Sequence, residues 1–204
     1  PVFVDVSADD YNIDPEKIEK AISKKTKAIM NVHLLGNPCK MDKIKKIVKD
    51  NNLLLIEDAC EAHGAEFRGK KVGSFGDLAT FSFFASHHIT TMEGGMIVTN
   101  NKMLYELGKS MRTFGWVRDL ENKNDIIKKF PNIDQRFLFL HSGFNLRPTE
   151  LQGAFGINQM KKINSLVNIR IQNSKYWNKR LKPFSEFLKI QEFKKFSKTS
   201  HLFY

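Results

Sequence analysis

Two adjacent histidines and a serine are the residues best suited to chemistry, and they lie in the stretch 80–95, TFSFFASHHITTMEGG. Ser82 lies in an aromatic run, and His87 and His88 follow it. An imidazole with an ordinary pKa of about 6.5 can act as a general base near neutral pH. Adjacent histidines point in different directions, so they do not form a simple zinc site. Composition favours a structural role for His88 over a ligand role.

Carboxylate and amide groups supply two further candidates. Asp58 follows Glu57 at the end of an apolar strand, where a bare carboxylate is costly unless a cation or a hydrogen-bond donor faces it. A helix cap or a surface ion pair would also explain Asp58, and the sequence leaves these alternatives open. Asn145 precedes a helical segment in GFNLRP, so it can bind an anion at the helix N-terminus or simply cap the helix.

The elements that must position these residues alternate between strands and helices. Apolar runs predict strands over 2–6, 27–34, 53–56, 79–84 and 95–99, and helical periodicity predicts helices from Pro15, over 41–51 and 102–111, and from about 148 towards 181. Asp14 and Pro15 supply an N-cap and a first-turn proline. Strands this apolar favour a mostly parallel sheet covered on both sides by helices, whose ligands bind beyond the carboxyl ends of the strands.

Composition places the chain in the ordinary globular class. No apolar run is long enough to span a bilayer, and the two cysteines lie in unrelated contexts, so we expect a soluble, cytoplasmic protein without a disulfide framework or a metal. The net charge is +11, but the lysines are scattered along the chain. Solvated lysine-rich faces are therefore favoured over nucleic-acid binding, and part of the charge can serve an anionic small molecule.

The ends and one internal stretch are unusual. The first strand has no preceding partner, and HLFY at the end resembles the start of another strand, so we expect a fragment. The stretch 113–142 is longer than ordinary connections, which predicts a functional or mobile segment.

In combination, these motifs resemble the DegT-type nucleotide-sugar aminotransferase family, which has the type I pyridoxal-phosphate fold. The matching segments are FVDV, NIDPEKIEKAI, VHLLGNP, LLIEDACEAHGAEFRGKKVGSFGD, TFSFF, TTMEGGMIVT and GFNLRPTELQGAFGINQMKKI, and they cover nearly the whole chain. The resemblance implies a three-layer αβα large domain over 1–165 that lacks its N-terminal part. Over 166–204 it implies a connecting helix and the start of a truncated C-terminal domain.

The family pattern implies a cofactor role for four residues. Asp58 would pair with the pyridinium nitrogen of pyridoxal 5'-phosphate or pyridoxamine 5'-phosphate, and Ser82 would bind the cofactor phosphate. Glu61 stands where many members have a glutamine near the ring hydroxyl. Asn145 resembles the asparagine that reaches the phosphate in the neighbouring subunit, which implies a homodimer with a shared active site.

His87 stands where the aminotransferases of the family have the lysine that binds the cofactor as a Schiff base. An imidazole cannot form that imine, and HHITTMEGG resembles the 3-dehydratase branch, which acts on nucleotide-linked 4-keto-6-deoxyhexoses. The resemblance implies that pyridoxamine phosphate condenses with the sugar C4 ketone. His87 would then remove a proton from the cofactor's methylene carbon as the C3 hydroxyl leaves, and an amino donor such as glutamate would regenerate the cofactor.

A second dehydratase branch uses an iron-sulfur cluster, and residues 113–142 contain none of the cysteines that it needs. This absence favours a self-sufficient dehydratase. The same stretch offers Trp116 for stacking and Arg118 for a diphosphate, with an ordinary packed loop as the alternative.

Two other functions remain open from the sequence. One is a nucleotide-sugar 4-aminotransferase that tolerates the histidine, and the other is a non-catalytic regulator or basic nucleic-acid-binding module on the same scaffold. Retention of Asp58, Ser82 and Asn145 together argues against the second, because a module without a cofactor has no need of them. We therefore expect an enzyme that binds neither nucleic acid nor membrane.

Overall fold

The computed structural model describes residues 1–203 and divides into two compact units. Unit 1 joins Pro1–Val98 to the chain from Leu151 onward, and unit 2 is Thr99–Glu150. We describe each unit separately. The predicted domain boundary at residue 165 is a different division of the chain, and it stays a prediction.

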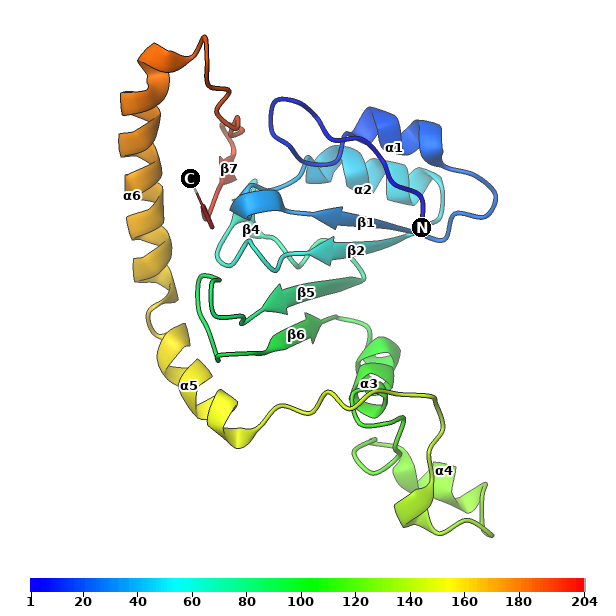
Figure 1. Ribbon diagram of the computed structural model, residues 1–204. Helices are drawn as coiled ribbons and strands as arrows, with labels where there is room; N and C mark the ends of the chain where they lie inside the picture. The colour runs from blue at the N-terminus through cyan, green and yellow to red at the C-terminus, as the bar shows by residue number, and fades with distance from the viewer. Residues whose placement is uncertain (204) are drawn as a thin grey trace. The chain divides into compact units, whose positions relative to one another are not determined.

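Unit 1 is built on a four-stranded sheet. The strands follow the order β1 (Ala28–Val32), β2 (Leu54–Asp58), β5 (Leu78–Ser82) and β6 (Gly95–Val98). β1, β2 and β5 are parallel, and β6 is antiparallel to β5, so the sheet is α/β in type and mostly parallel as predicted. The carboxyl ends of the three parallel strands therefore lie at one edge of the sheet (Figure 1).

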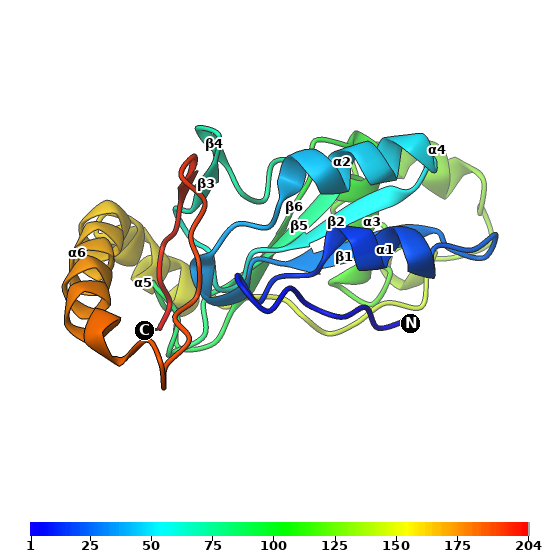
Figure 2. The same cartoon turned by 90° about the horizontal axis from the view of Figure 1, so that it is seen from above.

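One face of this sheet carries the main core. The helices α1 (Pro15–Ala21) and α2 (Met41–Asp50) lie side by side next to β1 and β2 (Figure 2) and contribute Ile18 and Ile44 to a cluster of buried side chains. The alternating burial of β1 and β2 follows from the two-residue repeat of strands. On the opposite face, Met30 and Leu54 are more than half exposed.

The carboxyl edge of the sheet is flanked by the end of the chain. The helices α5 (Glu150–Met160) and α6 (Ile163–Leu181) run past this edge (Figure 1). A small sheet there has the order β4 (Lys70–Lys71), β3 (Glu66–Phe67), β7 (Ser197–Lys198). Short 3-10 turns are η1 (Leu34–Gly36) and η3 (Lys182–Phe184). In the part of the chain that the structure describes, no helix has the length and apolarity needed to cross a membrane.

Unit 2 holds the long connecting stretch. It consists of α3 (Lys102–Met111), α4 (Lys123–Lys128) and the 3-10 turn η2 (Gln135–Phe137). A small apolar cluster forms its interior, made of Val117, Leu120 and Leu138 with half-buried neighbours. The stretch 113–142 is therefore locally folded around its own core.

Most predicted elements are confirmed. The predicted helix 102–111 matches α3, and α2 ends one residue before the predicted end. Asp14 caps α1, because its Oδ1 accepts a hydrogen bond of 3.0 Å from the backbone N–H of Glu16.

Two predicted strands, at the ends of the chain, are not found. Residues 2–6 form no strand, since only an isolated bridge joins Val6 to Ile13 and Phe3 is 93% exposed. Tyr204, the last residue of the second, lies outside the described residues, and Leu202 and Phe203 belong to no strand.

The end of the described chain packs against the loop after β1. Ser200 donates its backbone N–H to the carbonyl of Gly36 at 3.0 Å, and Leu202 donates to the carbonyl of Leu35 at 3.0 Å. Gly36 has φ +83°, and a Cβ on it would lie 2.6 Å from Ser200 Oγ and 2.8 Å from the backbone N of His201. Only glycine satisfies both the left-handed backbone and the close approach.

We expect Gly36→Ala to lower the free energy of unfolding by about 3 kcal/mol, because backbone strain and overpacking add. Gly69→Ala is the matched control: Gly69 also has a positive φ, but its Cβ would meet nothing within 4 Å. It should cost only about 1 kcal/mol. Urea unfolding of the two variants measures both values, and equal losses would show that the contact with Ser200 is unimportant.

Candidate functional site

Asp58 lies at the carboxyl end of β2, where it is half-buried. Its Oδ1 accepts hydrogen bonds from the backbone N–H of Cys60 at 3.0 Å and from Thr80 Oγ1 at 3.4 Å. The Cys60 side chain also hydrogen-bonds to the Asp58 carboxyl group. Oδ1 is thus fixed by the protein at the carboxyl end of β2.

Ser82 ends the adjacent strand β5 and begins the loop that carries His87. Its Oγ accepts from the backbone N–H of Phe84 at 3.2 Å. The loop closes on itself, because Phe83 donates its N–H to Gly94 at 2.9 Å and accepts from the N–H of Thr91 at 2.9 Å. The loop 83–94 therefore leaves and rejoins the sheet beside Ser82.

His87 is held in this loop by its backbone, and its ring packs against Phe84. Its N–H donates to the carbonyl of Phe84 at 3.1 Å, and the two rings meet edge to face with centroids 6.0 Å apart. Nδ1 of His87 is buried and has no partner among the described residues. A buried ring nitrogen without a hydrogen bond is costly, and it is available for proton transfer.

Helix α5 anchors the same loop. Gln152 Nε2 donates to the carbonyl of Glu93 at 2.7 Å, and Gln159 Oε1 accepts from the backbone N–H of Thr90 at 3.4 Å. The two glutamines are seven residues apart, so they lie two helical turns apart on one face of the helix. Contacts from both ends of α5 therefore hold the loop that carries His87.

Glu61 lies just after β2 and supports a strained turn. Its Oε2 accepts from the backbone N–H of Leu35 at 2.8 Å. Leu35 has φ +55°, a left-handed conformation that is unfavourable for a leucine. One oxygen of Glu61 thus has a structural task, whichever ligand the other faces.

The structure brings Asp58, Glu61, Ser82 and His87 to the carboxyl edge of the sheet in unit 1. Asn145 lies in unit 2, where it is exposed and forms an isolated bridge with Thr113. The ligand roles of all five residues stay predictions.

Sequence reasoning did not identify Glu57, a buried carboxylate near this edge that accepts several hydrogen bonds. Glu57 is fully buried, and its two oxygens accept four hydrogen bonds. Their donors are His33 Nε2 at 3.0 Å and the backbone N–H groups of Gly73 at 2.8 Å, Phe75 at 2.6 Å and Gly76 at 2.7 Å. Alternate residues of β2 are buried, and Glu57 occupies one of these buried positions. That alternation was the sequence signal that could have identified it.

The pKa of Glu57 reflects these contacts. Burial raises the pKa of its carboxyl, but the hydrogen bonds from His33, Gly73 and Gly76 outweigh burial and hold the pKa below its usual range. Glu57 is therefore ionised at neutral pH, although it is completely enclosed.

Two buried histidines lie behind the loop. His63 is 5% exposed, and neither of its ring nitrogens has a partner in the described chain. His88 is 3% exposed and hydrogen-bonds through Nε2 to the carbonyl of Ser200 at 3.1 Å. Burial lowers the pKa of each to about 4, so both rings are neutral at pH 7. The structural role predicted for His88 agrees with this contact.

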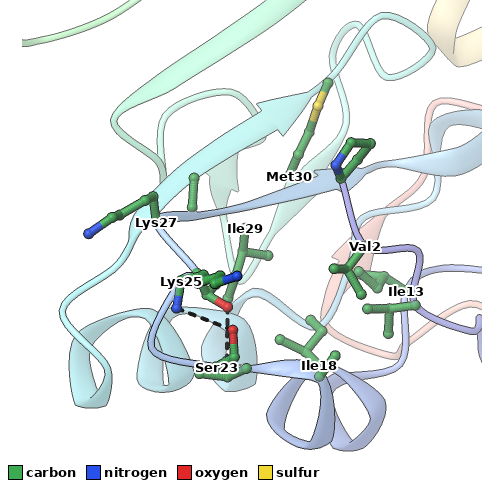
Figure 3. Close-up of a pocket in the computed structure, with 14 residues that line it drawn as sticks. Val2, Ile13, Ile18, Ser23, Lys25, Lys27, Ile29 and Met30 are labelled. Atoms are coloured by element: carbon green, nitrogen blue, oxygen red, sulfur yellow. Dashed lines mark hydrogen bonds between the residues drawn. The ribbon is translucent and has the colours of Figure 1, made fainter.

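The other concave regions have different chemistry. A cavity of about 320 Å³ lies at the amino end of β1, with Val2, Ile18 and Ile29 on its walls (Figure 3). It lies at the wrong end of the strands for a ligand of a parallel sheet. In unit 2, the guanidinium of Arg118 lies 4.2 Å from the ring centroid of Trp116, so these two residues contact each other.

The sequence matches a known protein family and several of its members. The model of the DegT/DnrJ/EryC1/StrS aminotransferase family matches residues 1–204. GDP-4-keto-6-deoxy-D-mannose 3-dehydratase of Escherichia coli O55:H7 is 41% identical over 192 residues, which cover 93% of this chain and 49% of the relative. GDP-perosamine synthase of Caulobacter vibrioides is 44% identical over 170 residues, 83% of this chain and 42% of the relative.

Solved structures of the same kind of dehydratase also match this chain. Two structures of GDP-4-keto-6-deoxymannose-3-dehydratase superpose with a TM-score of 0.88 at 39% identity, covering 98% of this chain and 51% of theirs. One, from E. coli, has bound hydrated PLP, and the other has a trapped PLP-glutamate geminal diamine. The chain spans about half the length of the relatives it matches.

Removal of the Glu61 side chain should destabilise the turn at Leu35. We expect Glu61→Ala to lower the free energy of unfolding by about 2 kcal/mol, because it leaves the N–H of Leu35 without its charged acceptor. Glu61→Gln keeps an acceptor oxygen and should cost less than about 1 kcal/mol. Urea titrations of both variants test this, and an equal loss would contradict it.

Acid should destabilise unit 1 through its buried histidines. Because the folded-state pKa of His63 is about 4, below the ordinary 6.5, only the unfolded chain takes up this proton as the pH falls from 6.5 towards 4. The contribution of His63 to the free energy of unfolding is therefore fully present above pH 6.5 and is lost as the pH falls towards 4. From pH 7 to pH 5, His63→Leu should lose about 2 kcal/mol less unfolding free energy than the wild type.

Urea titrations at the two pH values measure the difference. His141→Leu, at an exposed position of unit 2, is the matched control. A His63→Leu variant that is as acid-sensitive as the wild type would contradict the assignment.

Proposed function

The chain belongs to the DegT/DnrJ/EryC1/StrS aminotransferase family, and we propose that it carries the cofactor-binding part of a nucleotide-sugar 3-dehydratase. The substrate would be a nucleotide-linked 4-keto-6-deoxyhexose, and the reaction would remove its C3 hydroxyl. The single observation that carries this proposal is the imidazole of His87, with an unpartnered buried Nδ1, in a loop 83–94 that contains no lysine.

The residues at the carboxyl edge suit pyridoxal 5'-phosphate or its pyridoxamine form. The carboxylate of Asp58, held through Oδ1, suits a protonated ring nitrogen, since an ionised carboxylate stabilises a neighbouring cation. The hydroxyl of Ser82 accepts from Phe84 and can still donate its own proton to a phosphate oxygen. Glu61 has one oxygen left for the ring hydroxyl region, and Asn145 would reach the phosphate of a partner subunit.

When bound, the pyridoxamine form supplies an amine for the sugar ketone and a ring that accepts electrons. The protein supplies the proton transfers. His87 would take a proton at Nδ1 or Nε2 and deliver one to the departing hydroxyl oxygen, because an imidazole can be both acceptor and donor near neutral pH. The closed loop and α5 would hold the ring in place during both transfers.

The relatives support the choice of partners. One matching dehydratase and the perosamine synthases are named for GDP sugars, and another dehydratase is named for a dTDP sugar. The geminal diamine in one solved structure contains glutamate. We therefore propose a nucleotide sugar as substrate and glutamate as amino donor for a cytoplasmic homodimer. The 44% identity with GDP-perosamine synthase favours 4-amination as the second candidate function.

Product analysis separates the two functions. Full-length protein incubated with GDP-4-keto-6-deoxymannose, pyridoxal phosphate and glutamate should release ammonia and form a 3-deoxy sugar. A stable 4-amino sugar as the main product would instead establish amination. Borohydride reduction of the cofactor-loaded protein should leave no pyridoxyl group on any lysine.

Replacement of His87 tests its role directly. We expect His87→Asn to lower kcat by about a thousandfold, because general acid-base catalysis typically contributes that much. Binding of pyridoxal phosphate, measured by absorbance titration, should stay within about twofold. His141→Asn is the control for an exposed imidazole. Retention of most activity in His87→Asn would overturn the assignment.

A further inference from the structure

Glu57 carries a negative charge that hydrogen bonds fix in place. Oε1 accepts from the N–H groups of Phe75 and Gly76, and Oε2 accepts from Gly73 and from His33 Nε2. A proton on either oxygen would point at one of these donors. The carboxyl group is therefore ionised throughout the neutral range.

His33 does not neutralise this charge. Its Nδ1 accepts from the backbone N–H of Cys39 at 3.1 Å, so this nitrogen carries no proton, and Nε2 carries the proton that points to Glu57. The imidazole is neutral. The buried pair of Glu57 and His33 thus has a net charge of about −1, although a simple count would treat it as an ion pair.

Other charged groups around the pair leave this charge uncompensated. Asp10, which faces Cys39, has its own cations, with Lys40 Nζ at 3.3 Å and Lys194 Nζ at 3.9 Å. Burial raises the pKa of the Cys39 thiol, so it stays neutral. The turn at 73–76 contributes only backbone N–H groups to the contact.

Glu57 lies next to Asp58 on β2, so the two side chains point to opposite faces of the sheet. The pair also reaches Asp58 through the backbone, because His33 donates its N–H to the carbonyl of Asp58 at 3.0 Å. Water and salt screen a buried charge much less than a surface charge. A cation held by Asp58 would therefore interact with two carboxylates.

We propose that Glu57, oriented by His33, is a positioning residue that raises the proton affinity of the cofactor's ring nitrogen at Asp58. This inference rests on the proposed function. Two unit charges about 10 Å apart, at an effective dielectric constant of about 20, change a proton-binding constant about tenfold. The effect is electrostatic, so it depends on the charge of Glu57 and not on the presence of a side chain that fills the space.

The test measures protonation of the ring nitrogen and not activity. Full-length protein loaded with pyridoxal phosphate labelled with nitrogen-15 in the ring is titrated from pH 6 to pH 10, and solid-state NMR follows the ring nitrogen. In Glu57→Gln, the deprotonation midpoint should fall by about one unit relative to the wild type. Glu66→Gln, which removes a half-buried carboxylate paired with Lys71, should leave the midpoint unchanged.

His33→Gln separates charge from structure. A glutamine can donate to Glu57 and accept from Cys39, so the charge of Glu57 remains while the packing changes. Its midpoint should match that of the wild type. Equal shifts in Glu57→Gln and His33→Gln, or no shift in Glu57→Gln, would overturn the inference.

Three further outcomes are decisive. If Glu57→Gln does not fold, the carboxyl carbon of Glu57 is followed in the labelled wild type, and a protonated carboxyl at pH 7 defeats the inference. If the wild type binds no pyridoxal phosphate, the proposed function fails and this inference falls with it. A wild type that binds the cofactor without a Glu57 effect refutes only the inference.

Discussion

The buried carboxylate of Glu57 is the constraint on which the carboxyl edge of the sheet depends. It ties together three segments that are separate in sequence: β2 itself, the loop that begins at His33, and the turn at 73–76. Removing an acceptor of four hydrogen bonds would leave several buried donors unsatisfied, and each such donor typically costs about 1–3 kcal/mol. The positions of Asp58 and of the turn that Glu61 supports depend on these hydrogen bonds of Glu57.

The histidines divide into groups with different physical environments. His33 has a fixed tautomer because its Nδ1 accepts from the backbone N–H of Cys39, which leaves the proton on Nε2 next to Glu57. His63 has no partner in the described chain, and burial keeps it neutral. His87 combines an anchored backbone with an unpartnered ring nitrogen, which is the combination that acid-base chemistry needs. Residue type alone does not distinguish them, whereas their contacts do.

The sequence predicts local features well and long-range contacts poorly. The cap at Asp14 and the bounds of α3 follow from capping and periodicity, which involve residues a few positions apart. The strand predicted over 2–6 fails because a strand needs a hydrogen-bonded neighbour, and local β-propensity cannot supply one. The partners of Glu57 lie 16 to 24 positions away, so no local pattern reveals them.

The attachment of residues 200–202 to the loop at Leu35 and Gly36 has a consequence for folding order. These contacts join points about 165 positions apart along the chain, so the entropy of closing that loop must be overcome before they form. During synthesis, β1 and β2 emerge long before Ser200 exists. The packing at the carboxyl edge is therefore completed late, when residues 200–202 arrive and Ser200 hydrogen-bonds to the His88 ring.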